Sequence, residues 1–377
     1  MSVMRLQGID SFTWLPRAAS FSELRSEECC VVIDADCSYG YPLPLFAYTD
    51  EELPSLTKDK ILRTAVRNDP IYAIRLQEPI LCGDSTIITA RGEVLLDMMV
   101  MNGRRRAMPA ARGRDAHFSM EIEVPETRYL DCSAALLFFH SASGHHHSHW
   151  MIQTLPKLEL FERAKADFEK LLVYDSIQPY QLETLDHLGY PQDRIVQRAS
   201  TEALKIRELY VMYTWNDIMP HFGAIERLRS VARSQASSKE RIYVSRRDAR
   251  NVRRFLNEQE CLPVFEEFGF QTVVPGQLGL MEEIGLFSSA RLICGALGAG
   301  LCNSAYTAPG ARLVVIGDPC YAMDWVPELC GLRGHSHCYY FGNSFYSYES
   351  QHLGTHNNWV LDPQKLRKVL KEACELP

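Results

Sequence analysis

The sequence predicts an α/β protein in which two Rossmann-like domains face a cleft, preceded by a strand-rich N-terminal segment. Two observations lead to this fold class. From residue 126 onward, short apolar runs alternate with amphipathic segments, which is the pattern of parallel strands covered by helices. The alternation occurs twice over stretches of similar size, so we expect domains at 126–220 and 221–377. Ligands of such sheets bind at the carboxyl ends of the strands.

The composition supports a folded protein and excludes several functional classes. Of 377 residues, 46% are hydrophobic and 23% charged, which argues against disorder. The net charge of −7 disfavours binding to bulk nucleic acid. No apolar run approaches the roughly 18 residues of a membrane span, and the first residues do not resemble a signal peptide. The 12 cysteines form no C-x-x-C pair and indicate reduced thiols, so we expect a cytoplasmic protein.

The elements follow from local patterns. Residues 1–125 contain short apolar runs broken by Pro, Gly and Asp, which predict strands. In the first α/β unit we expect strands at 134–139, 170–174, 194–197 and 208–212, with helices at 150–164 and 180–188. In the second unit we expect strands at 241–245, 271–274, 291–294 and 312–316, with helices at 222–233, 251–268, 280–290 and 362–373. Asp362 caps the last helix and Pro363 occupies its first position.

A glycine-rich stretch follows the strand at 291–294. Gly295, Gly298 and Gly300 let the backbone approach a ligand closely, and a following helix would direct free N–H groups at an anion. The spacing is not G-x-G-x-x-G. On composition alone, a tight structural turn and a phosphate site are equally good interpretations.

Two arginines directly follow the strand at 241–245. Guanidinium groups bind phosphate oxygens in a bidentate manner, so Arg246 and Arg247 would form a diphosphate clamp if they lie beside the glycine turn. The alternative is a solvated basic helix start, which we favour for Arg250 and Arg254.

A histidine-rich loop precedes Trp150. His149 stands at the entry to a helix and is the best candidate for a general base. A zinc site in the loop at His145–His149 is a weaker alternative. A second possible metal site is formed by residues near the C-terminal end: Cys320, Cys330, His335, His337 and Cys338. The aromatic run Tyr339–Tyr348 fits a buried hairpin better than a sugar-stacking surface. Asp34 and Asp36 form the D-x-D pattern of metal-dependent sugar transfer, but we discount them as a metal site because they lie in the strand-rich front segment.

Three blocks, in this order, resemble glycosyltransferase family 61, whose bacterial members are often described as capsular polysaccharide biosynthesis proteins. The first is His149-Trp150 with Leu155-Pro156-Lys157-Leu158. The second is Ser245-Arg246-Arg247 with Arg253-Arg254 and Asn257-Glu258. The third is the acidic helix at 280–290 with the turn Gly295–Asn303. The resemblance covers about residues 131–373.

The resemblance implies a GT-B fold and an inverting, metal-independent transfer of a sugar from a nucleotide-sugar, which we expect to be UDP-linked, to a glycan acceptor in surface or capsular polysaccharide synthesis. Domain 126–220 would be the acceptor side and 221–377 the nucleotide-sugar side. The acceptor would be a glycan or a lipid-linked glycan, with peripheral association with the polysaccharide assembly machinery and no cofactor beyond the donor substrate.

The residue roles follow from the same resemblance. Arg246 and Arg247 would bind the diphosphate, and Gly298, Ala299 and Gly300 would cradle it. Either Glu282 or Glu283 would contact the ribose, and Asn303 would order the turn. His149 would be the catalytic base, with Asp131 as the alternative.

Two positions depart from the family pattern. Leu297 stands where the family has histidine. The stretch Val314–Asp318 lacks the carboxylate that the family often has near the position of Gly317. A catalytically inactive relative that binds nucleotide or glycan is therefore the alternative function. A metal-dependent enzyme using the histidine loop and a nicotinamide oxidoreductase are weaker alternatives.

Overall fold

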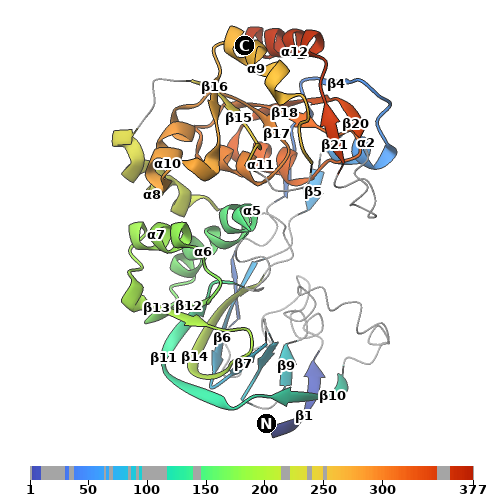
Figure 1. The fold of residues 1–377 in the computed structure, drawn as a ribbon. Coiled ribbons are helices and arrows are strands. Elements are labelled where there is room, and N and C mark those ends of the chain that lie inside the picture. The colour runs from blue at the N-terminus through green and yellow to red at the C-terminus, as the bar shows by residue number, and fades with distance from the viewer. Residues whose placement is uncertain are drawn as a thin grey trace. The chain divides into compact units, whose positions relative to one another are not determined.

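The computed structural model describes residues 2–9, 30–33, 38–62, 65–67, 71–83, 86–90, 93–95, 117–138, 146–213, 221–235, 240–248, 253–345 and 357–376 (Figure 1). The chain forms two compact units. Unit 1 comprises Met1–Cys37 and Asp69–Ala224, and unit 2 comprises Ser38–Asn68 and Ile225–Pro377. Within the described ranges, no helix has both the length and the apolar character needed to cross a bilayer.

Unit 1 is built on a mixed sheet. Its parallel part has the order β14-β11-β12-β13, formed by Ala203–Tyr213, Thr127–Leu136, Lys170–Tyr174 and Ile195–Arg198. Antiparallel pairing to β14 then extends this sheet through strands of the front segment. These are β1 (Ser2–Ile9), β2 (Cys30–Ile33), β6 (Ile71–Gln77), β7 (Ile80–Cys82), β8 (Thr86–Ile88), β9 (Glu93–Leu95) and β10 (His117–Val124). The front residues are thus rich in strands, as expected.

The helices of unit 1 lie between the parallel strands in sequence. They are α5 (His147–His149), the π-helix η3 (Trp150–Thr154), α6 (Pro156–Arg163), α7 (Pro179–His187) and the 3-10 helix η4 (Gln192–Arg194). Apolar side chains from both sheet parts, among them Leu76, Leu136 and Leu209, form one buried cluster. The parallel pairing confirms the α/β alternation predicted for this region.

Unit 2 is built on a parallel sheet with the order β16-β15-β17-β18-β19-β4. The strands are Gln271–Val273, Arg241–Val244, Leu292–Ala296, Arg312–Gly317, Ser336–Phe341 and, from the front segment, Ala47–Thr49. The chain passes from β15 to β16 on one side and then to β17 on the other side of β15. The β15–β17 boundary is therefore a topological switch point, where open α/β sheets bind their ligands.

Helices cover both faces of this sheet. They are α8 (Gly223–Val231), η5 (Ala232–Gln235), α9 (Glu258–Glu267), η6 (Pro275–Gln277), α10 (Leu280–Ser289), η7 (Ala299–Tyr306), α11 (Trp325–Arg333) and α12 (Pro363–Glu375), besides α2 (Ser55–Ile61). Helices α9 and α12 pack against each other, and α10 packs against η7. The short pairs β3–β5 (Ser38–Gly40, Ala65–Arg67) and β20–β21 (Asn343–Phe345, Asn358–Val360) complete the unit.

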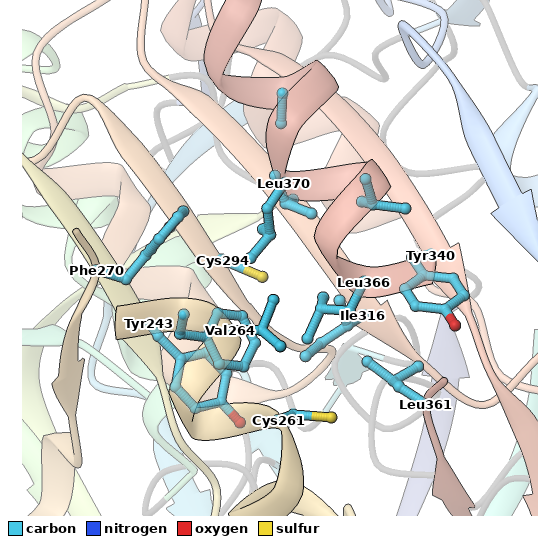
Figure 2. Packing of buried hydrophobic residues seen from close by; sticks show 14 of the residues in the cluster. Tyr243, Cys261, Val264, Phe270, Cys294, Ile316, Tyr340, Leu361, Leu366 and Leu370 are labelled. Atoms are coloured by element: carbon cyan, nitrogen blue, oxygen red, sulfur yellow. The ribbon is translucent and has the colours of Figure 1, made fainter. Parts of the chain in front are cut away.

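The core of unit 2 lies between the sheet and the pair α9–α12. Figure 2 shows Tyr243, Cys294 and Ile316 of the sheet beside Val264 of α9 and Leu370 of α12. Alternate strand residues point to opposite faces, so Val244 and Gly295 turn toward η7 on the other side. Asp362 accepts hydrogen bonds from the N–H groups of Gln364 and Lys365, which confirms the predicted cap of α12.

Two predicted elements differ from the structure. The helix expected over 251–268 begins only at Glu258. Arg253 has a positive φ of 54°, and the next residues run beside β21, where Leu256 N–H donates to Trp359 O (2.9 Å). Stacking of Phe255 on Trp359, with ring centroids 4.2 Å apart, holds this segment extended. The described part of the aromatic run, residues 339–345, is not a hairpin. Its two strands, β19 and β20, do not pair with each other: β19 pairs with β18 and β4, and β20 pairs with β21.

The front segment 1–125, expected as one N-terminal part, is divided between the units. Its residues 38–68 belong to unit 2, because β4 pairs with β19, and most of the rest belongs to unit 1. The later division falls between Ala224 and Ile225, inside α8.

Candidate functional site

The carboxyl edge of the unit 2 sheet brings Arg246 beside the glycine turn. Val244 of β15 pairs with Gly295 of β17, so the residues that follow each strand lie at the same height. The Nη1 group of Arg246 donates to the backbone oxygen of Leu297 at 3.0 Å. Arg246 and the glycine turn, 51 residues apart in the sequence, therefore meet at the switch point of the sheet.

Arg246 carries a positive charge that no ion pair within the described residues neutralises, although the charge of Asp248 favours it. Burial lowers the pKa of its guanidinium to about 10, and the nearby charge of Arg253 lowers it further. The group still remains charged at neutral pH. The Nε atoms of Arg246 and Arg253 are both buried without a hydrogen-bond partner, and neither arginine forms an ion pair with a carboxylate among the described residues. Because unpaired charge on half-buried side chains is unfavourable, the pair is suited to an anion supplied from outside.

Arg253, and not Arg247 as expected, lies near enough to Arg246 for its charge to lower the Arg246 pKa. Its guanidinium carbon lies 4.5 Å from the ring centroid of Tyr321, in the segment after β18. Arg247 is exposed, and its backbone N–H donates to Ser245 Oγ at 3.2 Å. No role was expected for Arg253 from the sequence. Its place in the second block of the family resemblance was the one feature that could have indicated such a role.

Gly298 is small because Arg246 occupies the space where a side chain would lie. A Cβ atom built at Gly298 would lie 1.7 Å from Arg246 Nη1. Gly295 and Gly300 have a different reason: a Cβ at either would meet Val244, at 2.9 Å and 3.2 Å. These two glycines therefore let η7 pack on β15. Ala299 and Gly300 open η7, so their N–H groups have no acceptor inside the helix.

A buried carboxylate holds the arginine segment in place. Glu258, the first residue of α9, accepts hydrogen bonds from Tyr243 Oη and Ser245 Oγ, both at 2.6 Å. Asn257 fixes the same helix end to β21 by donating to Leu361 O (2.8 Å) and accepting from Leu361 N–H (3.1 Å). The Asn-Glu pair of the second block thus positions the residues around Arg246.

The structure separates the two glutamates of α10. Glu282 is exposed, whereas Glu283 accepts a hydrogen bond from the Nδ2 group of Asn303, which is fully buried in η7. Burial raises the pKa of Glu283 to about 7, the charge of Asp248 adds to the rise, and the Asn303 bond opposes it. The charge of Asp248 also raises the pKa of Arg246. Glu283 and Asn303 therefore form one polar pair close to the arginines.

The raised pKa of Glu283 predicts that the free energy of unfolding falls as pH rises, and Glu283→Gln tests this. A carboxyl whose pKa is raised on folding stabilises the protein fully below its unfolded pKa, near 4.5, and this stabilisation is lost as pH rises through about 7. We expect the wild type to lose up to about 3 kcal/mol from this group between these values, and Glu283→Gln to show no such loss. Urea unfolding at pH 5 and pH 8 measures the difference. The exposed neighbour variant Glu282→Gln is the control, and a Glu283→Gln curve parallel to the wild type would contradict the assignment.

In unit 1, His149 ends α5, and the ring of the next residue, Trp150, stacks on Phe138, two residues after β11, with centroids 5.6 Å apart. Its Nδ1 atom is 2.7 Å from Gln153 Oε1. Since the amide oxygen accepts, Nδ1 carries the proton and Nε2 remains the basic nitrogen. Lys157 is buried one helix further along, and its Nζ donates to Leu137 O at 3.0 Å. Burial lowers the pKa of Lys157 well below the usual range for a lysine. This bond ties α6 to the end of β11.

Asp131 occupies a different position in unit 1. It is exposed on β11, five residues before the end of the strand, and pairs with Arg207 at 3.4 Å. Arg207 also pairs with Glu169. Five residues of strand span about 16 Å, so Asp131 does not share the carboxyl edge with His149.

His335, His337, Cys330 and Cys338 are interior groups of unit 2. Burial lowers the pKa values of His335 and His337 to about 4, so both rings are neutral at physiological pH. His335 Nε2 lies 2.8 Å from Thr307 Oγ1. In the part of the chain that the structure describes, no group of three or more His, Cys, Asp or Glu side chains is placed to hold a metal ion. His145, Asp34 and Asp36 lie outside the described residues.

Comparison with known proteins agrees with the geometry. No curated protein matches the chain. Residues 147–314 match the family model described as Glycosyltransferase 61, a range that includes His149, the arginines after β15, Glu283 and Asn303, and leaves out Asp131. The match supports assignment to glycosyltransferase family 61, and the protein is a glycosyltransferase that acts on a sugar donor and an acceptor.

Proposed function

We propose that the protein transfers a sugar, with inversion, from a UDP-linked donor to a hydroxyl group of a glycan or lipid-linked glycan in surface or capsular polysaccharide synthesis. The observation that carries the donor half is the pair Arg246 and Arg253, two guanidinium groups without a carboxylate partner at the switch point of a parallel sheet. The proposal keeps the GT-B arrangement implied by the resemblance, with the donor bound by unit 2 and the acceptor activated by unit 1.

The arginines supply what the leaving group needs. As the glycosidic bond breaks, negative charge develops on the diphosphate, and preorganised donors stabilise that charge. Arg246 and Arg253 donate from one side, and the free N–H groups of Ala299 and Gly300 at the start of η7 donate from the other. Two guanidinium charges do the work of a divalent cation in this scheme. Glu283 accepts a hydrogen bond from the ribose, and Asn303 positions Glu283.

His149 removes the proton from the acceptor hydroxyl. Gln153 holds the ring in the tautomer whose Nε2 lone pair is free to accept that proton. A single displacement, in which the acceptor oxygen attacks as the diphosphate departs, inverts the configuration of the sugar carbon. Each of the two units would thus contribute one half of the reaction.

Replacement of His149 by alanine is expected to reduce kcat by about 100-fold or more, because general base catalysis contributes factors of this size, while donor affinity stays within about twofold. Steady-state kinetics with the donor, together with calorimetric titration of UDP, measure the two effects. The partly exposed His187 of α7 provides the control variant His187→Ala. An equal loss of turnover and donor affinity would assign His149 a structural role.

Titration of the purified protein with UDP, GDP, ADP and CMP tests the donor half, each with and without EDTA. Preferential binding of UDP that persists in EDTA supports the proposal. UDP binding that requires a divalent cation contradicts the arginine mechanism, and preference for another nucleotide contradicts the choice of donor.

A further inference from the structure

Asp318, the residue after β18, is a buried carboxylate with an unused oxygen. It is 3% exposed. Its Oδ1 accepts hydrogen bonds from Cys320 N–H at 2.9 Å and from Ser344 Oγ at 2.7 Å. Its Oδ2 is buried and has no hydrogen-bond partner. Since buried polar atoms in proteins are nearly always paired, this oxygen indicates a partner that is not part of the chain.

A second orphan oxygen belongs to the same cluster. Asn357 is 1% exposed, and its Nδ2 donates to Ser344 Oγ at 3.0 Å. The Oδ1 of Asn357 is buried without a partner. Ser344 thus links Asp318 to Asn357. Asp318 and Asn357 each have one side-chain oxygen without a hydrogen-bond donor. Glu51 lies beside them and accepts from Ser344 N–H at 3.2 Å.

The unused capacity of this cluster is entirely that of hydrogen-bond acceptors. Burial raises the pKa of Asp318, hydrogen bonds from Cys320, Ser344 and Asn357 oppose the rise, and the charge of Glu51 adds to it. Among the described residues, Asp318 and Glu51 belong to no group of three or more His, Cys, Asp or Glu side chains placed to hold a metal ion. Hydroxyl groups are donors with the right geometry for a carboxylate oxygen and an amide oxygen at adjacent positions. The cluster is therefore suited to a polyhydroxylated ligand.

The cluster lies on the same edge of the sheet as the arginines. Ala296 of β17 pairs with Ile316 of β18, and Gly298 and Asp318, each two residues further on, follow these neighbouring strands. A Cβ at Gly317 would lie 4.0 Å from Leu297 Cβ. Arg253 packs on Tyr321, three residues after Asp318. The arginines and this cluster therefore follow neighbouring strands at one edge of the sheet.

We propose that Asp318 and Asn357 bind hydroxyl groups of the donor's sugar ring and determine which sugar the enzyme accepts. This inference rests on the proposed donor site at Arg246 and Arg253. Asp318 and Asn357 act on the sugar alone, so removing them should spare the nucleotide. Ser344 holds the two side chains in register.

Calorimetric titration of UDP, UDP-glucose, UDP-galactose, UDP-xylose and UDP-N-acetylglucosamine tests the proposal. In Asp318→Asn, we expect the Kd for UDP to stay within about twofold. We expect the Kd of the preferred UDP-sugar, relative to that of UDP, to rise about tenfold or more, because hydrogen bonds to a charged group are worth this much. Discrimination among the sugars should fall with it. The control is Glu240→Gln, an exposed carboxylate just before β15, at the opposite edge of the same sheet.

The outcomes separate this inference from the proposed function. Normal UDP binding with an unchanged ratio of sugar-nucleotide to UDP affinity in Asp318→Asn overturns the inference and leaves the donor site standing. Absence of UDP binding by the wild type overturns both. If Asp318→Asn loses UDP binding through misfolding, Asn357→Ala decides by the same ratio: a rise of several-fold supports the inference, and no change overturns it.

Discussion

Substitution of Arg246 by alanine is expected to weaken UDP binding by about 100-fold and to abolish measurable sugar transfer. The variant removes one of two guanidinium groups at the switch point and leaves Arg253 alone beside the turn. Hydrogen bonds to a charged group contribute about 1.5–3 kcal/mol, and 2.7 kcal/mol corresponds to about 100-fold. Loss of charge stabilisation for the departing diphosphate lowers kcat in addition. Titration calorimetry and initial rates measure the two effects.

The neighbouring arginine provides a matched control. Arg247 has the same side chain one position later, but it is exposed. Arg247→Ala should therefore retain donor affinity within about threefold, since exposed charges contribute little. If Arg247→Ala were the more damaging of the two variants, the diphosphate would lie on the other side of the β15 end from the one proposed.

Gly298→Ala is expected to reduce donor affinity by about tenfold to 100-fold while leaving the fold intact. The new Cβ would lie 1.7 Å from Arg246 Nη1 and 2.8 Å from its Cζ, so the guanidinium must leave its bond to Leu297 O. The backbone of Gly298 is extended, with φ 172°, and accommodates alanine. The arginine can move because it is flexible, so the damage falls on binding. Thermal unfolding and UDP titration measure the two effects separately.

Gly279→Ala is the control for this substitution, because a Cβ there meets nothing within 4 Å and the residue precedes α10 on the same unit. Both variants should unfold within a few degrees of the wild type. Gly298→Ala with wild-type UDP affinity would mean that the position of Arg246 seen here is not the one that binds the donor.

The parts of the fold that the sequence predicted are those specified locally. The strand expected at 170–174 is β12, and the helix expected at 280–290 is α10, ending one residue earlier. A short apolar run or a 3.6-residue period contains all the information such elements need. The start of α12 was predictable because Asp362 and Pro363 act on their own helix.

The parts that escaped prediction depend on distant partners. Residues 253–257 have a helical pattern, but Trp359, about one hundred residues later, pairs with them and draws Arg253 into the position beside Arg246. The choice between Glu282 and Glu283 likewise depends on Asn303, which is located in another helix. A single sequence shows which residues are chemically capable, whereas packing between segments decides which of them meet.

The edge strand β4 has a consequence for how the protein is made. β4 lies next to β19, and Tyr340 Oη donates to Asp50 Oδ2 across 290 residues of sequence. On the ribosome, this early strand leaves the exit tunnel long before its partner is synthesised. It must wait as an unpaired edge, which is a site of aggregation and of chaperone binding. A fragment that starts at residue 225 would lack this strand altogether and would expose β19 as an open edge.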